Sequence, residues 1–301
     1  MSIYVDENTK VIVQGITGSQ GSFHADLMLK YGTKIVAGTN PSKAGSEVCG
    51  VPVYASVKQA KQETGANASI IFVPPFAAKD AIKEAIDNEI EICVCVTENI
   101  PLNDMVEVNA YLQNKKTRLI GPNCPGIISP DKCKLGIMPQ DIHLKGHVGI
   151  VSRSGSLTYE TIKQLTNMNI GQSSTIGIGG DGIKGTSFLD AIKAFNEDDD
   201  TYAIIMIGEI GGNGEQVAAD WAYENCKKPI LGFIGGRSAP EGKRMGHAGA
   251  VVSGKGGSAL DKINYLESKN IEVADIPDHI GEKLKEVLIK NGIYEKCLSK
   301  W

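Results

Sequence analysis

Short apolar runs rich in β-branched residues recur along the chain and alternate with helix-like segments. In the first half of the 301 residues these runs are KVIVQG, KIVAG, ASIIFVP, EICVCVT and TRLIGP, each followed by a glycine or proline turn. The segment AAKDAIKEAIDNE carries its apolar residues at helical spacing. Strands that alternate with helices build βαβ units around a parallel sheet, so the sequence predicts an α/β fold.

The same alternation restarts in the second half, where HVGIVS, SSTIGIGG, YAIIMIGEIGG, KPILGFIGG and IEVAD are the expected strands. The expected helices there include SLTYETIKQLT, GEQVAADWAYENC and the C-terminal DHIGEKLKEVLIKNGIYE. Residues 121–146, between the two halves, contain several prolines and show no clean period. We therefore predict two α/β domains, residues 1–125 and 146–301, joined by an irregular connecting segment at residues 126–145.

Composition excludes several classes of protein. The net charge of −4 argues against sequence-independent binding of nucleic acid, which needs a strongly basic face. Seven cysteines without a Cys-x-x-Cys pair suggest neither a disulfide framework nor a zinc site. No apolar run approaches the ~20 residues of a membrane helix, and the N-terminus resembles no targeting peptide. We expect a soluble protein of the cytoplasm, or the processed form of an organellar one.

A glycine-rich turn follows the first expected strand. Gly15, Gly18 and Gly21 leave room for backbone N–H groups to approach a phosphate at a helix N-terminus, although a tight turn that binds nothing is the alternative. A site for NAD also needs an acidic residue at the end of the next strand. The segment TNPSKAG at that point has Lys43 and no acid, which disfavours NAD and allows NADP or coenzyme A.

Polar residues follow two further strands. Thr97 and Glu98 end the run VCVTE, where ordinary surface polarity is the simpler interpretation. Residues 154–156, Ser-Gly-Ser, begin a helix and either cap it or form, with Arg153, a cradle for an anion. They do not form the G-x-S-x-G turn of a serine hydrolase.

The segment GKRMGHAGAVVSGKGG contains a histidine with small neighbours. Gly246, Ala248 and Gly249 leave His247 open to an incoming group. Glu209, after an apolar strand, would be costly to bury without a partner, and an imidazole N–H is a suitable one. Because phosphorylation of histidine needs one free ring nitrogen and a carboxylate on the other, we interpret this pair as a phosphohistidine site. The alternatives are a loop histidine without function and an ordinary helix-terminal charge.

The segment Gly249–Gly256 nearly matches the phosphate-binding loop of nucleoside triphosphatases. Its last position is Gly256, where that loop needs a serine or threonine to hold Mg²⁺. We therefore reject a nucleoside triphosphate site here, and expect that any such nucleotide is bound by another chain.

The motifs together resemble one known family. From about residue 4 to residue 290 the chain is similar to the α subunits of succinyl-CoA synthetase (succinate–CoA ligase), through QGITGSQGSFH, NPSKAG, VTENIP, GPNCPG, GIVSRSGSLTYE, GIGGD, MIGEIGG and GKRMGHAGA. The resemblance implies an N-terminal Rossmann-like CoA-binding domain followed by a flavodoxin-like CoA-ligase domain. It also implies a reversible reaction of the tricarboxylic acid cycle, in which a nucleoside triphosphate, succinate and CoA give a nucleoside diphosphate, phosphate and succinyl-CoA.

The resemblance also implies roles for particular residues. His247 is the phosphorylated residue, Glu209 orients its ring, Tyr159 belongs to the substrate region, and Ser154, Gly155 and Ser156 form the helix start that holds the phosphate. The implied contacts with CoA are Thr17, Gly18, Ser19, Gln20, Lys43, Val96, Thr97 and Glu98. No metal site is implied in this chain. An ATP-grasp β subunit, in a hetero-dimer or hetero-tetramer, would bind ATP or GTP with Mg²⁺.

Three other functions remain open at this point. One is an NAD(P)-linked oxidoreductase or redox sensor with a Rossmann domain, and a second is a CoA-binding module without catalysis. The third is a related ligase that acts on another acid, such as malate or acetate.

Overall fold

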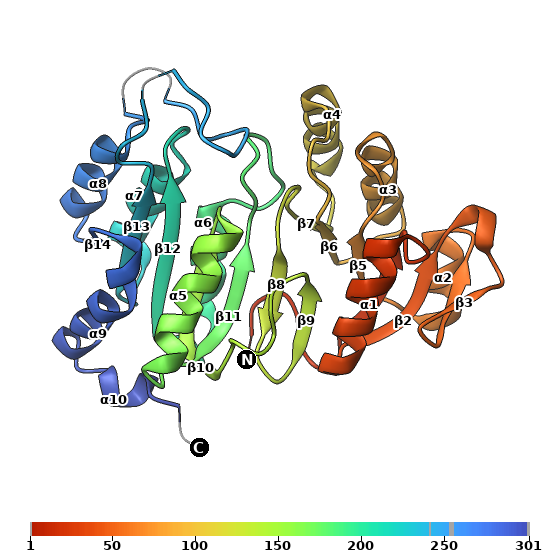
Figure 1. The fold of residues 1–301 in the computed structure, drawn as a ribbon, viewed down its shortest axis with the longest axis horizontal. Coiled ribbons are helices and arrows are strands. Elements are labelled where there is room, and N and C mark those ends of the chain that lie inside the picture. The colour runs from red at the N-terminus through yellow and green to blue at the C-terminus, as the bar shows by residue number, and fades with distance from the viewer. Residues whose placement is uncertain (1, 241, 253–255, 300–301) are drawn as a thin grey trace.

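Two mostly parallel sheets, each flanked by helices, make up the chain (Figure 1). The computed structural model describes residues 2–240, 242–252 and 256–299. In chain order the elements are β1 Lys10–Gln14, α1 Ser19–Tyr31, β2 Lys34–Thr39, the 3₁₀ turn η1 Pro41–Lys43, β3 Glu47–Val48, β4 Val51–Tyr54, α2 Val57–Thr64, β5 Ala68–Ile71, α3 Pro75–Asp87, β6 Ile92–Cys95, α4 Leu102–Leu112, β7 Arg118–Ile120, β8 Gly126–Ser129, β9 Cys133–Gly136, β10 Lys145–Ser152, α5 Gly155–Asn167, β11 Gln172–Gly177, α6 Phe188–Glu197, β12 Ala203–Glu209, α7 Gly214–Asn225, β13 Ile230–Gly235, α8 Ala259–Ser268, β14 Glu272–Ala274, η2 Pro277–His279, α9 Ile280–Lys290 and α10 Tyr294–Cys297.

The first sheet has the strand order β3-β4-β2-β1-β5-β6-β7. All its pairs are parallel except β3 with β4. Without the short β3, the chain order of the strands is 3-2-1-4-5-6, which is the Rossmann order. Buried apolar residues of α1 belong to one core cluster and those of α2, α3 and α4 to another, because the helices cover opposite faces of the sheet. The prediction of a Rossmann-like first domain is confirmed.

The second sheet has the order β14-β13-β12-β10-β11-β8-β9. Its five parallel strands follow the chain order 2-1-3-4-5, read from β11 to β14, and this is the flavodoxin order. Helices α5 and α9 pack on one face, while α6, α7 and α8 pack on the other. The predicted flavodoxin-like second domain is therefore also confirmed.

The segment between the domains differs from the expectation. Residues 126–145 were expected to be irregular, but they contain the antiparallel hairpin β8–β9, and β8 pairs with the edge strand β11. The hairpin is hard to recognise because glycines stand at its ladder positions. Gly126 and Gly136 are paired, and a Cβ on either one would lie 2.2 Å from a backbone oxygen. Two strands at such close approach need glycine, which lowers the apolar signal of both strands.

The hairpin also connects the two domains (Figure 1). The backbone N–H of Lys134 in β9 donates to Thr33 Oγ1, and that hydroxyl donates to the Lys134 carbonyl at 2.8 Å. One apolar cluster continues from Val11 and Met28 of the first domain, through Leu135 of the hairpin, to Val151 of the second. The domains thus share a core, which fixes the strand ends of one sheet relative to those of the other.

Two smaller features complete the fold. The expected long C-terminal helix is wrong in its length: α9 ends at Lys290, and Gly292, with φ of 66°, separates it from α10. Among the described residues, no helix has the length and the apolar character that crossing a membrane requires.

The close approach of α1 to the first glycine turn gives a test of the fold. A Cβ on Gly21 would lie 2.2 Å from the Gly15 carbonyl oxygen, which is backbone and has no rotamer to change. We expect Gly21→Ala to lower the free energy of unfolding by about 2 kcal/mol, measured by urea denaturation. Gly182→Ala is the control, because nothing lies within 4 Å of its new methyl group. Equal stability of the two variants would contradict the packing described here.

Candidate active site

Two helix N-termini lie at the points where the strand order reverses. In the first sheet β1 separates β2 from β5, and the glycine turn and α1 follow it directly. In the second sheet β10 separates β11 from β12, and α5 follows it. Ligands of open α/β sheets bind at such crevices, at the carboxyl ends of the strands. The topology therefore points to these two turns.

One cavity of about 670 Å³ extends from Gln20, in the first turn of α1, to the start of α5. Residues from both domains line it, and nine of the residues expected in the site are among them: Gln20, Val96, Thr97, Glu98, Ser154, Gly155, Ser156, Tyr159 and His247. Thr17, Gly18, Ser19 and Lys43 are not among the lining residues. The cavity is large enough for a small-molecule ligand and is open to the imidazole of His247.

The His247 imidazole is held by a carboxylate. Its Nδ1 lies 2.7 Å from Glu209 Oε2, at the end of β12. An ionised carboxylate only accepts hydrogen bonds, so in the neutral ring Nδ1 carries the proton and Nε2 keeps its lone pair. The hydrogen bond to Glu209 raises the pKa of His247 above its ordinary value of 6.5, and burial opposes that rise. The side chain keeps 31% of its surface exposed, so the ring is fixed but accessible.

Three buried charged residues, Arg153, Glu215 and Lys262, hold Glu209 in place. Arg153 Nη2 lies 3.1 Å from Glu209 Oε1, and Arg153 Nη1 donates to the Gly211 carbonyl at 3.1 Å. Glu215 accepts from the backbone N–H of Glu209 at 3.2 Å and pairs with Lys262 at 2.6 Å. The Lys262 ammonium also donates to the carbonyls of Glu209 and Gly211. Glu209, the partner of His247, is thus held in place through both its side chain and its main chain.

Glycines allow the imidazole to reach this position. A Cβ on Gly180 would lie 2.3 Å from His247 Cγ, so the ring packs directly on the Gly180 backbone. The N–H of Gly249 donates to the Gly180 carbonyl at 3.0 Å and ties the histidine loop to the segment after β11. Gly246, just before the histidine, has φ of 75°, a conformation that other residues rarely adopt.

The start of α5 faces the same cavity. Ser154 is the N-cap, and its hydroxyl accepts from the Leu157 N–H at 3.4 Å. The other N–H groups of the first turn have no partner within the helix, and the helix dipole adds positive potential there. Burial raises the pKa of Tyr159 to about 12, so its hydroxyl stays protonated and can donate a hydrogen bond. This end of the cavity suits an anion.

The first domain contributes the other wall. Gly15 has φ of 82°, and a Cβ there would lie 3.2 Å from the Phe72 backbone, so the turn after β1 needs glycine. The Asn40 amide donates to Thr17 Oγ1, which joins this turn to the turn that carries Lys43. Lys43 itself is exposed in η1. Thr97 Oγ1 donates to the Val73 carbonyl at 2.7 Å, which orders the residues beside Glu98.

The comparisons with known proteins agree with this architecture. The model of the CoA binding domain family matches residues 6–99, and that of the CoA-ligase family matches residues 151–271. Proteins named ADP-forming succinate–CoA ligase subunit alpha, from Staphylococcus epidermidis and Staphylococcus aureus, are each 58% identical to the chain over 300 residues. The alignment covers 99% of this chain and 99% of each relative. The chain belongs to the succinate–CoA ligase α-subunit family.

Solved structures share the fold of this succinate–CoA ligase α-subunit family member over nearly its whole length. ATP citrate lyase from Methanothrix soehngenii, in complex with citrate and coenzyme A, gives a TM-score of 0.87 at 24% identity, over 99% of this chain and 52% of the lyase. Acetyl-coenzyme A synthetase 1 of Ca. Korarchaeum cryptofilum gives 0.74 at 20% identity, over 92% and 60%. At these identities the likeness shows a common fold. The resemblance seen in the sequence is confirmed, and a CoA-ligase reading is favoured over an oxidoreductase.

The sequence interpretation missed several parts of the site. An anion cradle of Arg153 and the serines that follow it was one of two interpretations of this segment, but the Arg153 guanidinium turns to Glu209. Lys262 could have been found from the sequence, because a lysine stands at a core position of α8, between Ala259 and Leu266. The ends of the near-match to the nucleoside triphosphatase loop, Gly249 and Gly256, are described, but Gly254 and Lys255 lie outside the described residues.

The contact of His247 with Gly180 is testable. A methyl group at residue 180 would push the ring away from Glu209, so Gly180→Ala should lower the pKa of His247 towards 6.5. An NMR titration of the histidine signals measures this pKa, and Gly182→Ala, two residues along, is the matched control. A pKa unchanged in Gly180→Ala would show that the ring does not depend on this glycine.

Proposed function

We propose that the chain is the α subunit of a succinate–CoA ligase and that His247 carries a phosphoryl group during turnover. The observation that supports this most directly is the pair formed by Glu209 Oε2 and His247 Nδ1, 2.7 Å apart, beside a cavity lined by both domains. A ring held at Nδ1 presents Nε2 as the nucleophile. The N-terminus of α5 offers backbone N–H groups to the phosphoryl oxygens.

The proposed reaction has three transfers. Nε2 of His247 attacks the terminal phosphorus of the nucleoside triphosphate, and the nucleoside diphosphate leaves. A carboxylate oxygen of succinate then attacks the phosphorus, the N–P bond breaks and succinyl phosphate forms. The CoA thiolate finally attacks the acyl carbon, and phosphate leaves as the thioester forms. The proton on Nδ1 stays with the Glu209–His247 hydrogen bond, so the carboxylate balances the charge on the ring throughout.

CoA would be held by the first domain. The glycine turn and the helix start at Thr17, Gly18, Ser19 and Gln20 suit the diphosphate, and Lys43 adds a cation nearby. Val96, Thr97 and Glu98 lie in the wall of the shared cavity, where they would contact the pantetheine arm. Tyr159 would then donate a hydrogen bond within the acyl region. In this arrangement the thiol end approaches the α5 N-terminus.

The remaining parts of the reaction are assigned to a partner. The family name identifies the chain as one of at least two kinds of subunit. We assign the nucleotide, ATP or GTP with Mg²⁺, to a β subunit of the ATP-grasp class, because Gly256 stands where a phosphate-binding loop in this chain would need serine or threonine. Relatives from bacteria and seven free cysteines support a reducing cytoplasm as the location.

Replacement of the histidine tests the proposed chemistry. In complex with the β subunit, His247→Asn should lose CoA-ligase turnover and the acid-labile, base-stable phosphate that nucleoside triphosphate leaves on the chain. His279→Asn is the control, since His279 also pairs with a carboxylate, Asp275 at 3.1 Å, but is exposed and lies outside the cavity. Radiolabel from the γ-phosphate that persists on His247→Asn would refute the assignment.

The lysine after β2 tests the assignment of CoA to the first domain. Loss of one exposed charge-assisted contact should raise the KM for CoA by about fivefold in Lys43→Ala and leave kcat within about twofold. Lys58→Ala, an exposed lysine on α2 with no described partner, should change neither constant. The prediction fails if the two variants have the same KM for CoA.

A further inference from the structure

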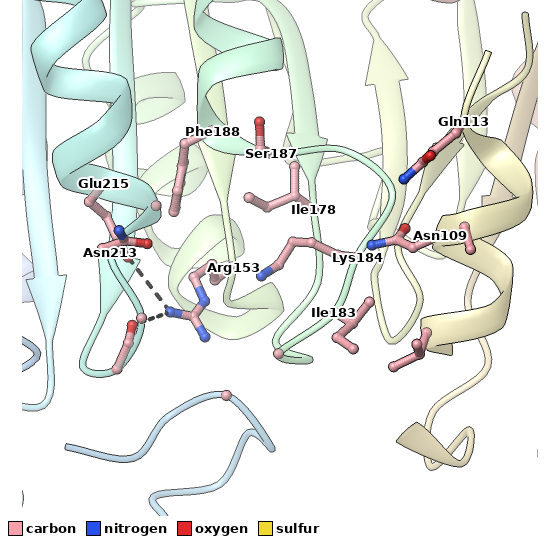
Figure 2. Close-up of a pocket in the computed structure, with 17 residues that line it drawn as sticks. Asn109, Gln113, Arg153, Ile178, Ile183, Lys184, Ser187, Phe188, Asn213 and Glu215 are labelled. Carbon is pink, nitrogen blue, oxygen red and sulfur yellow. Dashed lines mark hydrogen bonds and ion pairs between the residues drawn. The ribbon is translucent and has the colours of Figure 1, made fainter. Parts of the chain in front are cut away.

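A second cavity, of about 630 Å³, lies between α4 of the first domain and the loops after β11 and β12 of the second (Figure 2). We call it the Lys184 cavity. It is lined by Asn109 of α4, by Ile183, Lys184 and Phe188, and by Arg153 and Asn213 among others. The proposed function uses none of Asn109, Lys184 or Asn213.

Two cations face each other in this cavity. Figure 2 shows the amino group of Lys184 directed towards Arg153. Within the described part of the chain, Lys184 makes no hydrogen bond or ion pair. Arg153 is 6% exposed, and its buried Nε has no hydrogen-bond partner. Arg153 is already paired with Glu209 Oε1 at 3.1 Å and with Glu215 Oε1 at 3.7 Å, so the repulsion that an added anion would relieve acts mainly on Lys184.

The ionisation of Lys184 agrees with this geometry. Burial and, after it, the Arg153 charge lower the pKa of Lys184 to about 8, although the charges of nearby carboxylates oppose this shift. A bound anion would offset both effects, because it restores an opposite charge beside the ammonium. Occupation of the cavity should therefore favour the protonated amine.

The acidic groups nearby are already engaged. Glu209 holds His247 and Arg153. Glu215, which also lines the cavity, pairs with Lys262 at 2.6 Å and with Arg153 at 3.7 Å. Asp181, on the loop before Lys184, accepts from the Asn123 amide at 2.9 Å. Lys184 therefore has none of these three carboxylates as a direct partner, although each of them acts on its charge at longer range.

The start of α7 adds neutral donors. Its N-cap, Asn213, makes no side-chain hydrogen bond to the helix, so the first N–H groups of this 12-residue helix are not capped by that side chain. Gly211, Gly212 and Gly214 leave the backbone beside them bare. Phe188 lies beside Gly214 at this helix start, and Ile183 also lines the cavity, so part of the lining is apolar and suits a short hydrocarbon chain.

We propose that the Lys184 cavity binds a small oxyanion, a carboxylate or a phosphate, between Lys184, Arg153 and the N-terminus of α7. The site goes beyond the proposed function, and binding there requires neither CoA nor phosphorylation of His247. It would nevertheless influence the histidine, because an anion beside Arg153 competes with Glu209 for the guanidinium. The inferred role is a second, regulatory anion site linked to the imidazole through one arginine.

Competitive labelling of lysines in the full-length chain tests this directly. Trace acetic anhydride acylates each free amine, and mass spectrometry of the Lys184 peptide gives its rate with succinate, with inorganic phosphate, or with chloride at equal ionic strength. An anion at roughly ten times its Kd should slow labelling of Lys184 about tenfold. Slowing by succinate alone, or by phosphate alone, identifies the class of anion. The proposal fails if neither anion slows the reaction, or if Lys58 is slowed equally, or if Lys184 is never labelled.

Variants separate this site from the one at His247. In His247→Asn the protection of Lys184 should persist, so loss of the phosphohistidine and loss of the anion site are independent results. By calorimetry on the full-length chain, Lys184→Met should bind one anion fewer than the unaltered chain, Lys184→Arg should restore that binding, and Lys58→Met should leave it unchanged. Equal binding by Lys184→Met and the unaltered chain would overturn the proposal.

Discussion

The carboxylate of Glu209 is the group on which the site depends. It is about nine-tenths buried at the end of a parallel strand, where an unpaired charge would cost several kcal/mol. The imidazole on one oxygen and the guanidinium on the other remove most of that cost. Because both partners need the carboxylate in one place, its position fixes the orientation of His247. The raised pKa of the histidine is the electrostatic result of the same contact.

The arrangement of the two sheets explains why residues from distant parts of the sequence meet here. In each sheet the strand order reverses at one central strand, β1 in the first sheet and β10 in the second. A helix begins shortly after each of these strands. The β8–β9 hairpin extends the second sheet towards α1 and shares its apolar core with both domains. The two crevices are therefore held against one cavity, so that a ligand bound by the first domain can extend to the imidazole of the second.

The sequence predicted the parts of the molecule that follow local periodicity. Both domain folds, most strands and the pairing of Glu209 with an imidazole N–H were within reach, because a buried acid after an apolar strand needs a donor. The hairpin was not, since Gly126 and Gly136 replace the apolar residues that mark a strand. The orientation of the Arg153 side chain could not be predicted from the sequence either. It follows from the position of Glu215 and the Gly211 carbonyl, which only the fold brings near.

The buried Glu215–Lys262 pair contributes more to the position of the Glu209 main chain than to the stability of the fold. Apolar residues of similar volume often replace such a pair without loss of stability, whereas removing one partner costs about 3–5 kcal/mol. An apolar pair, however, would remove the present partners of the Glu209 N–H and carbonyl, and would leave the Gly211 carbonyl with Arg153 alone. Contacts to these groups fix the main chain at the point where the Glu209 side chain leaves the sheet. The Glu215–Lys262 pair therefore positions the His247 imidazole through the backbone of Glu209, and Arg153 positions it through the Glu209 side chain. The orientation of the ring thus depends on two separate sets of contacts.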